Sequence, residues 1–333
     1  MKDNKTFIIA ELSANHNNDL DLALKTVRAA AESGADAIKV QTYTADSLAL
    51  DVDNEYFGPK KEGLWKGIRP YDLYKEAALP YEWHKPIQEE AQKHNLIFFS
   101  SPFDLEGIDF LETLRVPLYK IASFEITDIP LIRYAASKGK PMIISTGVAN
   151  VEDIKLAVEA CKSEGNSDIT LLKCTSQYPA QISDANMATI PDMRERFGVK
   201  VGLSDHTMGS IVPVTAVSLG ATVIEKHFIL DRRLGGADSS FSMEPSEFKD
   251  MVQQVRLVEE AIGEIKYDVN EKDVYKRRSL FVTQDIAEGQ VFTKDNIRSL
   301  RPGVGTHPMH YYDILNTRAT KSYKKGDPLD VNN

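Results

Sequence analysis

Residues 199–227 read VKVGLSDHTMGSIVPVTAVSLGATVIEKH and contain the unit that decides the fold. Two short apolar runs, Val199–Leu203 and Thr222–His227, are separated by an amphipathic stretch, Ile211–Leu219. Apolar runs of this length are typical of strands buried on both faces, and the spacing between them is typical of a helix. A strand, a helix and a second strand in this order predict a parallel β-α-β connection.

The same unit recurs along most of the chain. Further strands are predicted at Phe7–Leu12, Ala37–Gln41, Ile97–Ser101, Leu118–Ile121, Pro141–Thr146 and Ile169–Cys174. Helical patterns cover Leu20–Ser33, Tyr81–His94, Ile154–Glu164 and, after the last strand, Glu247–Gly263. Eight strands alternating with helices predict an α/β fold of the (β/α)8 TIM-barrel type. The alternative is an open doubly wound sheet, but no glycine-rich phosphate loop follows the first strand.

The pattern changes after the last long helix. Residues 265–277 are polar and predict a linker between a barrel domain at 1–264 and a second domain at 278–333. The second domain combines short strand-like segments with turn residues and has no long helical pattern. We expect a small β module that docks on another surface, because so short a segment has little core of its own.

Composition excludes several classes of protein. The chain has 333 residues, 42% of them hydrophobic and 27% charged, with a net charge of -9. This acidic balance argues against nucleic acid as a partner. No run of about 18 apolar residues and no signal peptide occur, so we expect no membrane association and a cytoplasmic location. The two cysteines, Cys161 and Cys174, lie in core-like segments and do not suggest a disulfide framework.

One connection, residues 43–80, is unusually long for a compact domain. It contains six aromatic residues among glycines, prolines and charges: Tyr43, Tyr56, Phe57, Trp65, Tyr71 and Tyr74. Long loops are usually functional or disordered. The aromatic content favours a packed lid or a wall of the substrate site over disorder.

Polar residues follow all eight predicted strands, where the active site of a barrel lies. Lys39 and Lys120 are the best candidates for binding an anion, because a lysine inside an apolar strand is costly unless it is paired. Serine and threonine hydroxyls nearby would complete a site for phosphate and carboxylate. The alternative is that an internal glutamate, such as Glu11 or Glu225, neutralises each lysine. Lys173 and Lys226 are ambiguous.

Two histidines, His206 and His227, end adjacent predicted strands. Side by side, they could bind a divalent metal through neutral ring nitrogens, with water, substrate or a carboxylate as further ligands. Asp205 and Glu225 could support them. The alternative is that the histidines are capped core residues. His16 is a weaker third candidate, for which we favour a structural role or a role in supporting a ligand.

Eight segments in this order resemble the sialic acid synthase family: IAELSANH at 9–16, IKVQT at 38–42, FSSPF at 99–103, YKIASFE at 119–125, STG at 145–147, KCTSQYP at 173–179, GLSDHT at 202–207 and EKHF at 225–228. The resemblance covers essentially the whole chain, including a C-terminal module similar to type III antifreeze proteins (a SAF domain). Further segments resemble the pseudaminic acid branch of the family: GLW at 63–65, YDLY at 71–74, PYEWH at 80–84 and IEKHFILD at 224–231.

The resemblance implies a transferase that condenses phosphoenolpyruvate with an N-acetylated amino sugar. It implies a phosphoenolpyruvate site of Lys39, Ser101, Lys120, Ser123, Ser145, Ser176 and Ser204. It implies His206 and His227 as ligands of a divalent metal, Mn2+ or else Mg2+ or Co2+. The sugar side would comprise Gln41, Tyr178, Asp238 and Arg301, and the catalytic groups would be Glu125, Glu11 and the two histidines. Glu125 is favoured over Glu11 as the general base.

The resemblance also implies a domain-swapped homodimer, in which the SAF module of one chain covers the barrel mouth of the other and brings Arg301 to the sugar. For the pseudaminic acid branch the sugar is 2,4-diacetamido-2,4,6-trideoxy-L-altrose, whose methyl group and second acetamido group would suit the aromatic loop at 43–80. Alternatives are an N-acetylneuraminate or legionaminate synthase, a sugar-phosphate aldolase, and a carbohydrate- or ice-binding protein with an inactive barrel.

Overall fold

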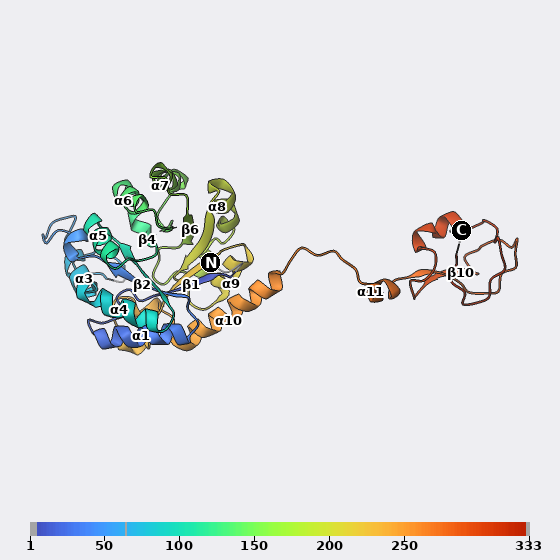
Figure 1. Cartoon of the computed structure of the whole chain (residues 1–333), viewed down its shortest axis with the longest axis horizontal. Coiled ribbons are helices and arrows are strands. Elements are labelled where there is room, and N and C mark those ends of the chain that lie inside the picture. The colour runs from blue at the N-terminus through green and yellow to red at the C-terminus, as the bar shows by residue number, and fades with distance from the viewer. Residues whose placement is uncertain (1–4, 64, 331–333) are drawn as a thin grey trace. The chain divides into compact units, whose positions relative to one another are not determined.

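Eight parallel strands close into a barrel in chain order, as the sequence predicts (Figure 1). The computed structural model describes residues 5–63 and 65–330. The strands are β1 (Phe7–Glu11), β2 (Ala37–Thr42), β3 (Ile97–Pro102), β4 (Tyr119–Ile121), β5 (Met142–Ser145), β6 (Ile169–Cys174), β7 (Lys200–Asp205) and β8 (Val223–His227). The barrel closes between β8 and β1, where Glu11 is paired with His227 on one side and with Lys39 on the other.

Helices surround the barrel, with α1, α4 and α10 in contact along one side of it (Figure 1). The main helices are α1 (Leu20–Glu32), α4 (Tyr81–Lys93), α5 (Leu105–Thr113), α6 (Ile129–Ser137), α7 (Val151–Ser163), α8 (Thr189–Phe197), α9 (Ile211–Ser218) and α10 (Pro245–Ile262). Helix α7 begins three residues before its predicted start, because the Asn150 side chain accepts a hydrogen bond from the Asp153 amide and caps the first turn. Short 3-10 turns are η1 (Ser123–Glu125), η2 (Ile182–Asp184), η3 (Arg232–Leu234) and η4 (Ser239–Phe241).

Strand alternation decides which polar residues enter the barrel. On β2, Ile38 and Val40 pack in the core between sheet and helices, whereas Ala37 packs in the barrel interior. Because side chains alternate along a strand, Lys39 points into the barrel with Ala37. The same rule turns Lys226 outward on β8, where its ammonium lies 2.7 Å from the carboxylate of Asp205. This settles the ambiguity at Lys226, which is a buried structural residue.

The long connection at 43–80 is packed rather than extended. It contains two short helices, α2 (Ala45–Leu48) and α3 (Pro70–Ala77). The ring of Tyr43 packs edge-on against Tyr74 and Phe103, at centroid distances of 6.2 and 5.2 Å. Tyr43, Trp65 and Tyr74 line the barrel mouth, and we call these three residues the aromatic wall. The predicted packed wall is therefore present, although Tyr56 is 78% exposed and takes no part in it.

A second unit, residues 264–333, has its own small core. It contains α11 (Glu271–Tyr275), β9 (Ser279–Val282) paired antiparallel with β10 (Ile297–Leu300), η5 (Pro308–His310) and α12 (Tyr311–Ile314). Leu280, Phe292 and Leu329 are buried in this core. The predicted linker at 265–277 contains α11, a turn of helix that the sequence reading omitted and that the Asn270 side chain caps.

Within residues 5–63 and 65–330, no helix is both long and apolar enough to cross a bilayer.

Candidate active site

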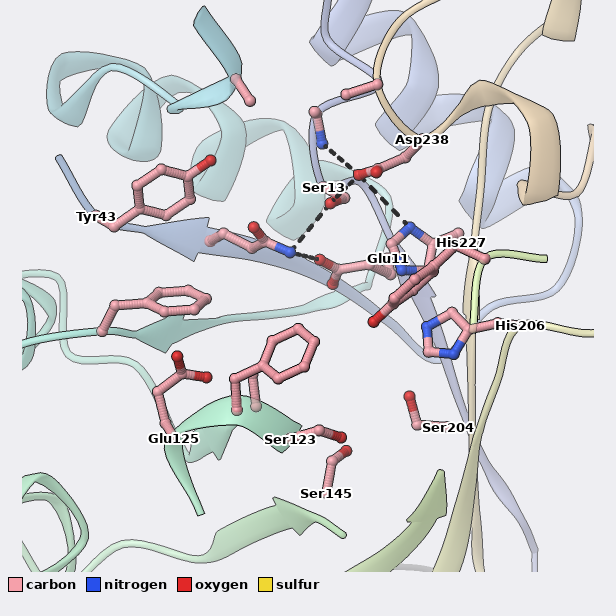
Figure 2. Close-up of a pocket in the computed structure, with 18 of the residues that line it drawn as sticks. Glu11, Ser13, Tyr43, Ser123, Glu125, Ser145, Ser204, His206, His227 and Asp238 are labelled. Atoms are coloured by element: carbon pink, nitrogen blue, oxygen red, sulfur yellow. Dashed lines mark hydrogen bonds and ion pairs between the residues drawn. The ribbon is translucent and has the colours of Figure 1, made fainter. Parts of the chain in front are cut away.

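A cavity of about 390 Å³ opens at the carboxyl ends of the barrel strands. It is lined by most of the residues that the sequence singled out: Glu11, Lys39, Gln41, Lys120, Ser123, Glu125, Ser145, Tyr178, Ser204, His206, His227 and Asp238. Figure 2 shows Glu11, Ser123, Glu125, Ser145, Ser204, His206, His227 and Asp238 converging on one space. The prediction that polar strand ends meet at one mouth is confirmed for every strand except β3, whose Ser101 does not line the cavity.

At the floor of the cavity lie two lysines and two glutamates, all buried. Lys39 Nζ lies 2.5 Å from Glu11 Oε2 and 3.8 Å from Glu225 Oε2, and Lys120 Nζ lies 3.6 Å from Glu225 Oε1. Burial opposes the charge on Lys39, but Glu11 and Glu225 together raise the pKa of Lys39. The charge of Lys39 is therefore neutralised by internal glutamates, which the sequence offered as the alternative to anion binding. Lys39 nevertheless lines the cavity.

Lys120 is the less satisfied of the two lysines. The only partner described for its ammonium is Glu225, at ion-pair rather than hydrogen-bond distance, and burial lowers the pKa of Lys120. An ammonium carries three donors, and buried donors are rarely left without acceptors. The hydroxyl of Ser145 is buried beside the same cavity and also has no hydrogen-bond partner in the part of the chain that the structure describes. An anionic group with several oxygens would satisfy both.

The serines predicted to hold phosphoenolpyruvate fall into two groups. Ser123, Ser145 and Ser204 line the cavity. Ser101 and Ser176 are not among the lining residues: Ser101 is fully buried and its hydroxyl accepts from Lys39 Nζ at 3.4 Å, and Ser176 Oγ lies 3.8 Å from Cys174 Sγ. These two serines support cavity-lining residues from behind.

Gly147 lies where a side chain would disturb this serine group. Its amide donates to Ser123 Oγ at 3.1 Å. An added Cβ would lie 2.8 Å from Ser123 Oγ and 3.2 Å from Cys174 Sγ, and it would also overlap the hydroxyl of Ser176.

We therefore predict that Gly147→Ala displaces Ser123 and raises the KM for an anionic substrate about tenfold, the cost of one weakened hydrogen bond to a charged group. Steady-state kinetics with phosphoenolpyruvate measure this effect, and an unchanged KM contradicts it. The KM for the second substrate serves as the internal control and should stay the same.

The two predicted metal ligands lie side by side, with ring centroids 5.2 Å apart. His206 Nδ1 lies 3.1 Å from the Thr175 carbonyl, an arrangement in which Nδ1–H donates and Nε2 keeps its lone pair. His227 Nδ1 is buried 3.9 Å from Asp238 Oδ2 and has no hydrogen-bond partner among the described residues. Burial and the neighbouring His206 hold the pKa of His227 well below its ordinary value, so this ring is neutral.

This pair fits a divalent cation only together with other ligands. In the described ranges, no group of three or more His, Cys, Asp and Glu side chains is arranged to hold a metal ion. Burial opposes the charge on His206, but Cys174 raises its pKa. In their neutral forms the two imidazoles would provide two positions, and substrate or water oxygens would fill the rest. His16 is buried away from the pair, with Nε2 3.2 Å from the Ala77 carbonyl, which agrees with the predicted structural role.

The opposite part of the cavity carries Glu125, in the 3-10 turn after β4 (Figure 2). Its Oε2 atom is buried, and no residue within 5–63 and 65–330 makes a hydrogen bond to it. Burial raises the pKa of Glu125 to about 7, against which Lys120 acts in the lowering direction. A carboxyl group with this pKa can accept a proton near neutral pH, as a general base must.

The third part of the cavity combines polar and aromatic side chains. Gln41 Nε2 donates to Glu11 Oε1 and to Ser13 Oγ, both at 3.0 Å. The ring of Tyr178 packs against His206 at 4.5 Å and against Trp65 at 6.1 Å between centroids. Such a mixture of rings and amide groups suits a sugar that carries apolar substituents.

Sequence reasoning missed several lining residues. Ser13 and Cys174 were given no role of their own, yet both line the cavity, and the wall predicted for the connection at 43–80 was not assigned to individual residues. Cys174 was interpreted as a core residue, and it is buried, but its Sγ lies 3.9 Å from His206 Nδ1. Alternation along β6 places Cys174 inside the barrel with Leu172, and this signal was available in the sequence. Arg301 belongs to the second unit, where it is exposed just after β10.

A closed (β/α)8 barrel with buried lysines, carboxylates and paired histidines at the carboxyl ends of its strands defines an enzyme that acts on small polar anions. The chain belongs to the NeuB family, whose profile matches residues 26–267. A SAF domain matches residues 277–330. Both parts of the family resemblance inferred from the motifs are confirmed.

Relatives extend along nearly the whole chain. It is 48% identical over 330 residues to a pseudaminic acid synthase of Campylobacter jejuni, covering 98% of this chain and 96% of the relative. It is 40% identical over 331 residues to an N,N'-diacetyllegionaminic acid synthase of Legionella pneumophila, covering 97% and 93%. Its fold is similar to the crystal structure of an N-acetylneuraminic acid synthetase from Leptospira borgpetersenii in complex with citrate, with TM-score 0.72, 35% identity and coverage of 81% and 89%.

Proposed function

We propose that the chain acts as a pseudaminic acid synthase. It would condense phosphoenolpyruvate with 2,4-diacetamido-2,4,6-trideoxy-L-altrose and water to give a nonulosonic acid and phosphate. The observation that carries the proposal is the set of buried, unpartnered polar atoms facing one cavity: Ser145 Oγ, Glu125 Oε2 and His227 Nδ1. The higher identity to the pseudaminic than to the legionaminic acid synthase supports this choice of sugar.

In the proposed reaction, C3 of phosphoenolpyruvate forms a bond to the aldehyde carbon of the open-chain sugar. The resulting oxocarbenium at C2 is attacked by water, and the C2–O bond to phosphate then breaks. Lys39 and Lys120 hold phosphoenolpyruvate at the cavity floor with the hydroxyls of Ser123 and Ser145, which supplies proximity. A divalent cation, Mn2+ in our proposal, would bind His206 and His227 and polarise the aldehyde oxygen.

Glu125 takes the proton of the attacking water in this proposal. Glu11 is the alternative base, but its Oε2 lies 2.5 Å from Lys39 Nζ and its Oε1 accepts from Gln41. Glu11 Oε2 makes no hydrogen bond but is held in this ion pair, whereas Glu125 Oε2 has neither a hydrogen bond nor an ion pair among the described residues. The free oxygen can accept a proton without breaking an existing contact.

The sugar specificity follows from the aromatic wall. A 6-deoxy sugar presents a methyl group where N-acetylmannosamine presents a hydroxyl, and apolar rings favour the methyl. The indole N–H of Trp65 is buried without a hydrogen-bond partner among the described residues and can donate to an acetamido carbonyl. A sugar with two acetamido groups therefore uses more of this cavity than one with a single group.

The experiment compares specificity constants for the diacetamido altrose, a diacetamido mannose and N-acetylmannosamine, with and without a chelator. We expect the altrose to be preferred at least about tenfold, the discrimination that one apolar substituent provides, and we expect the chelator to abolish turnover. An equal or better constant for N-acetylmannosamine contradicts the choice of sugar. Full activity in the presence of the chelator contradicts the proposed requirement for a metal.

We also propose that the SAF domain completes the site of a second chain in a homodimer and brings Arg301 to the sugar. The segment that joins the units exposes Ile265 and Tyr267, at 92% and 91%, a surface that a partner would cover. At low phosphoenolpyruvate, where Lys120→Met and Arg301→Ala chains are each impaired, mixing the two should restore about a quarter of the sites, because half of the dimers are mixed and each holds one intact site. If no activity is recovered, the proposed exchange of SAF domains between chains is contradicted.

We propose the cytoplasm as the location of the protein. The two cysteines are free and buried, which fits this proposal.

A further inference from the structure

The loop after β1 holds the loop after β8 in place. The Asn15 side-chain amide donates to the Phe228 carbonyl at 3.0 Å and to Ser242 Oγ at 2.8 Å. Further along, the Asn17 amide donates to the Leu234 carbonyl at 3.1 Å. The second of these loops contains Asp238, so residues 13–17 determine where this carboxylate lies.

Ser13 contacts the Asp238 carboxylate directly, and its backbone is strained. Its φ of 47° lies in the left-handed region that side chains other than glycine rarely adopt. This conformation costs roughly 1 kcal/mol for a residue with a Cβ and costs glycine nothing. A serine at this position is therefore less stable than a glycine would be, unless its hydroxyl has a role.

The hydroxyl of Ser13 joins two polar groups of the cavity (Figure 2). It donates to Asp238 Oδ2 at 2.5 Å and accepts from Gln41 Nε2 at 3.0 Å, and the same Gln41 nitrogen donates to Glu11. The result is a hydrogen-bonded chain that runs from Asp238 on one side to the Glu11 and Lys39 pair on the other.

The contacts described for the Asp238 carboxylate all fall on one of its two oxygens. Oδ2 accepts from Ser13 and from the Ala14 amide at 3.4 Å, and it lies 3.9 Å from His227 Nδ1. No donor from the described part of the chain is seen at Oδ1, although Asp238 lines the cavity. The carboxylate is thus held by one oxygen and keeps the other for a ligand.

We infer that Ser13 is a positioning residue for the sugar: its hydroxyl fixes Asp238 so that Oδ1 accepts a hydrogen bond from a sugar hydroxyl. This inference rests on the proposed function, because it assigns Asp238 to the sugar side. Ser13 does not touch the cavity-floor lysines, so its loss should weaken sugar binding far more than phosphoenolpyruvate binding.

The test uses two variants that both lack the hydroxyl but differ in backbone strain, Ser13→Gly and Ser13→Ala. Both should raise the KM for the diacetamido altrose about tenfold, the effect of losing a hydrogen bond to a carboxylate. Both should leave the KM for phosphoenolpyruvate within about twofold of wild type. Ser13→Gly should melt no lower than wild type because it relieves the strain, so its kinetic defect would not reflect misfolding.

A wild-type sugar KM in Ser13→Gly overturns the inference, and so does an equal rise in both KM values. These outcomes are distinct from failure of the proposed function, since that failure is a wild-type enzyme that turns over none of the sugars. If the wild-type enzyme turns over the sugar and the Ser13 variants have its sugar KM, only the role of Ser13 is rejected and the proposed function stands.

Discussion

Lys120→Met is expected to raise the KM for phosphoenolpyruvate about 100-fold, the loss of a buried, charge-assisted contact to phosphate or carboxylate. Lys120 is 2% exposed and has only Glu225, at 3.6 Å, as a described partner. Its donors are thus available for the substrate. Methionine matches the length of the lysine side chain and leaves little space unfilled.

The variant should stay folded because Glu225 keeps other partners. It still accepts from Ser204 Oγ at 2.9 Å and lies 3.8 Å from Lys39 Nζ. Lys39→Met, in contrast, would leave Glu11 without its cation, and an unpaired buried charge costs about 3–5 kcal/mol. Thermal melts of both variants test this difference, which should appear as a lower midpoint for Lys39→Met.

The matched control is Lys173→Met, a substitution on the outward face of β6. Lys173 Nζ donates to the Cys174 carbonyl at 3.0 Å and does not line the cavity. Its loss should leave the KM for phosphoenolpyruvate unchanged. Equal KM values in the Lys120 and Lys173 variants would contradict the assignment of the anion site.

Glu125→Gln is expected to lower turnover about 100-fold or more, the usual contribution of a general base. Wild-type turnover should fall as the pH drops through about 7, because burial raises the pKa of Glu125 to about 7 and a base must be unprotonated. Glutamine cannot titrate, so the residual activity of the variant should lack this acidic limb. Metal affinity should change little. Near-normal turnover in the metal-loaded variant contradicts the role.

Stability gives a second measurement on the same residue. The folded carboxyl binds its proton more tightly than the unfolded one, since its pKa rises from 4.5 to about 7. The burial of Glu125 therefore lowers the free energy of unfolding. This destabilisation grows as the pH increases from 4.5 to 7 and is fully present above pH 7. Glu125→Gln should be at least as stable as wild type at pH 8. A clearly less stable variant would mean that Glu125 is a structural residue.

The barrel could be predicted from the sequence because each strand is a short apolar run and the runs alternate with helical patterns. Strand alternation would also have separated the inward Lys39 and Lys120 from the outward Lys173 and Lys226. On β8, for example, Val223 packs inside and Ile224 outside, so Lys226 must point outward and His227 inward.

Contacts between distant loops could not be predicted in this way. Ser13 and Asp238 are 225 positions apart, and no local periodicity relates them. Trp65 lies in a connection without regular spacing, so only its aromatic character indicated a role. Glu125 Oε2 and Ser145 Oγ are unpaired because no hydrogen-bonding group from the described residues lies near them. This can be seen only once the chain is folded.

The most direct test of the central claim is phosphate release from phosphoenolpyruvate labelled with 18O at the oxygen that bridges carbon and phosphorus. We predict release only when the metal and the diacetamido altrose are both present, with the label retained in the phosphate because the C2–O bond breaks. Release without a sugar, or unlabelled phosphate, would contradict condensation by this route.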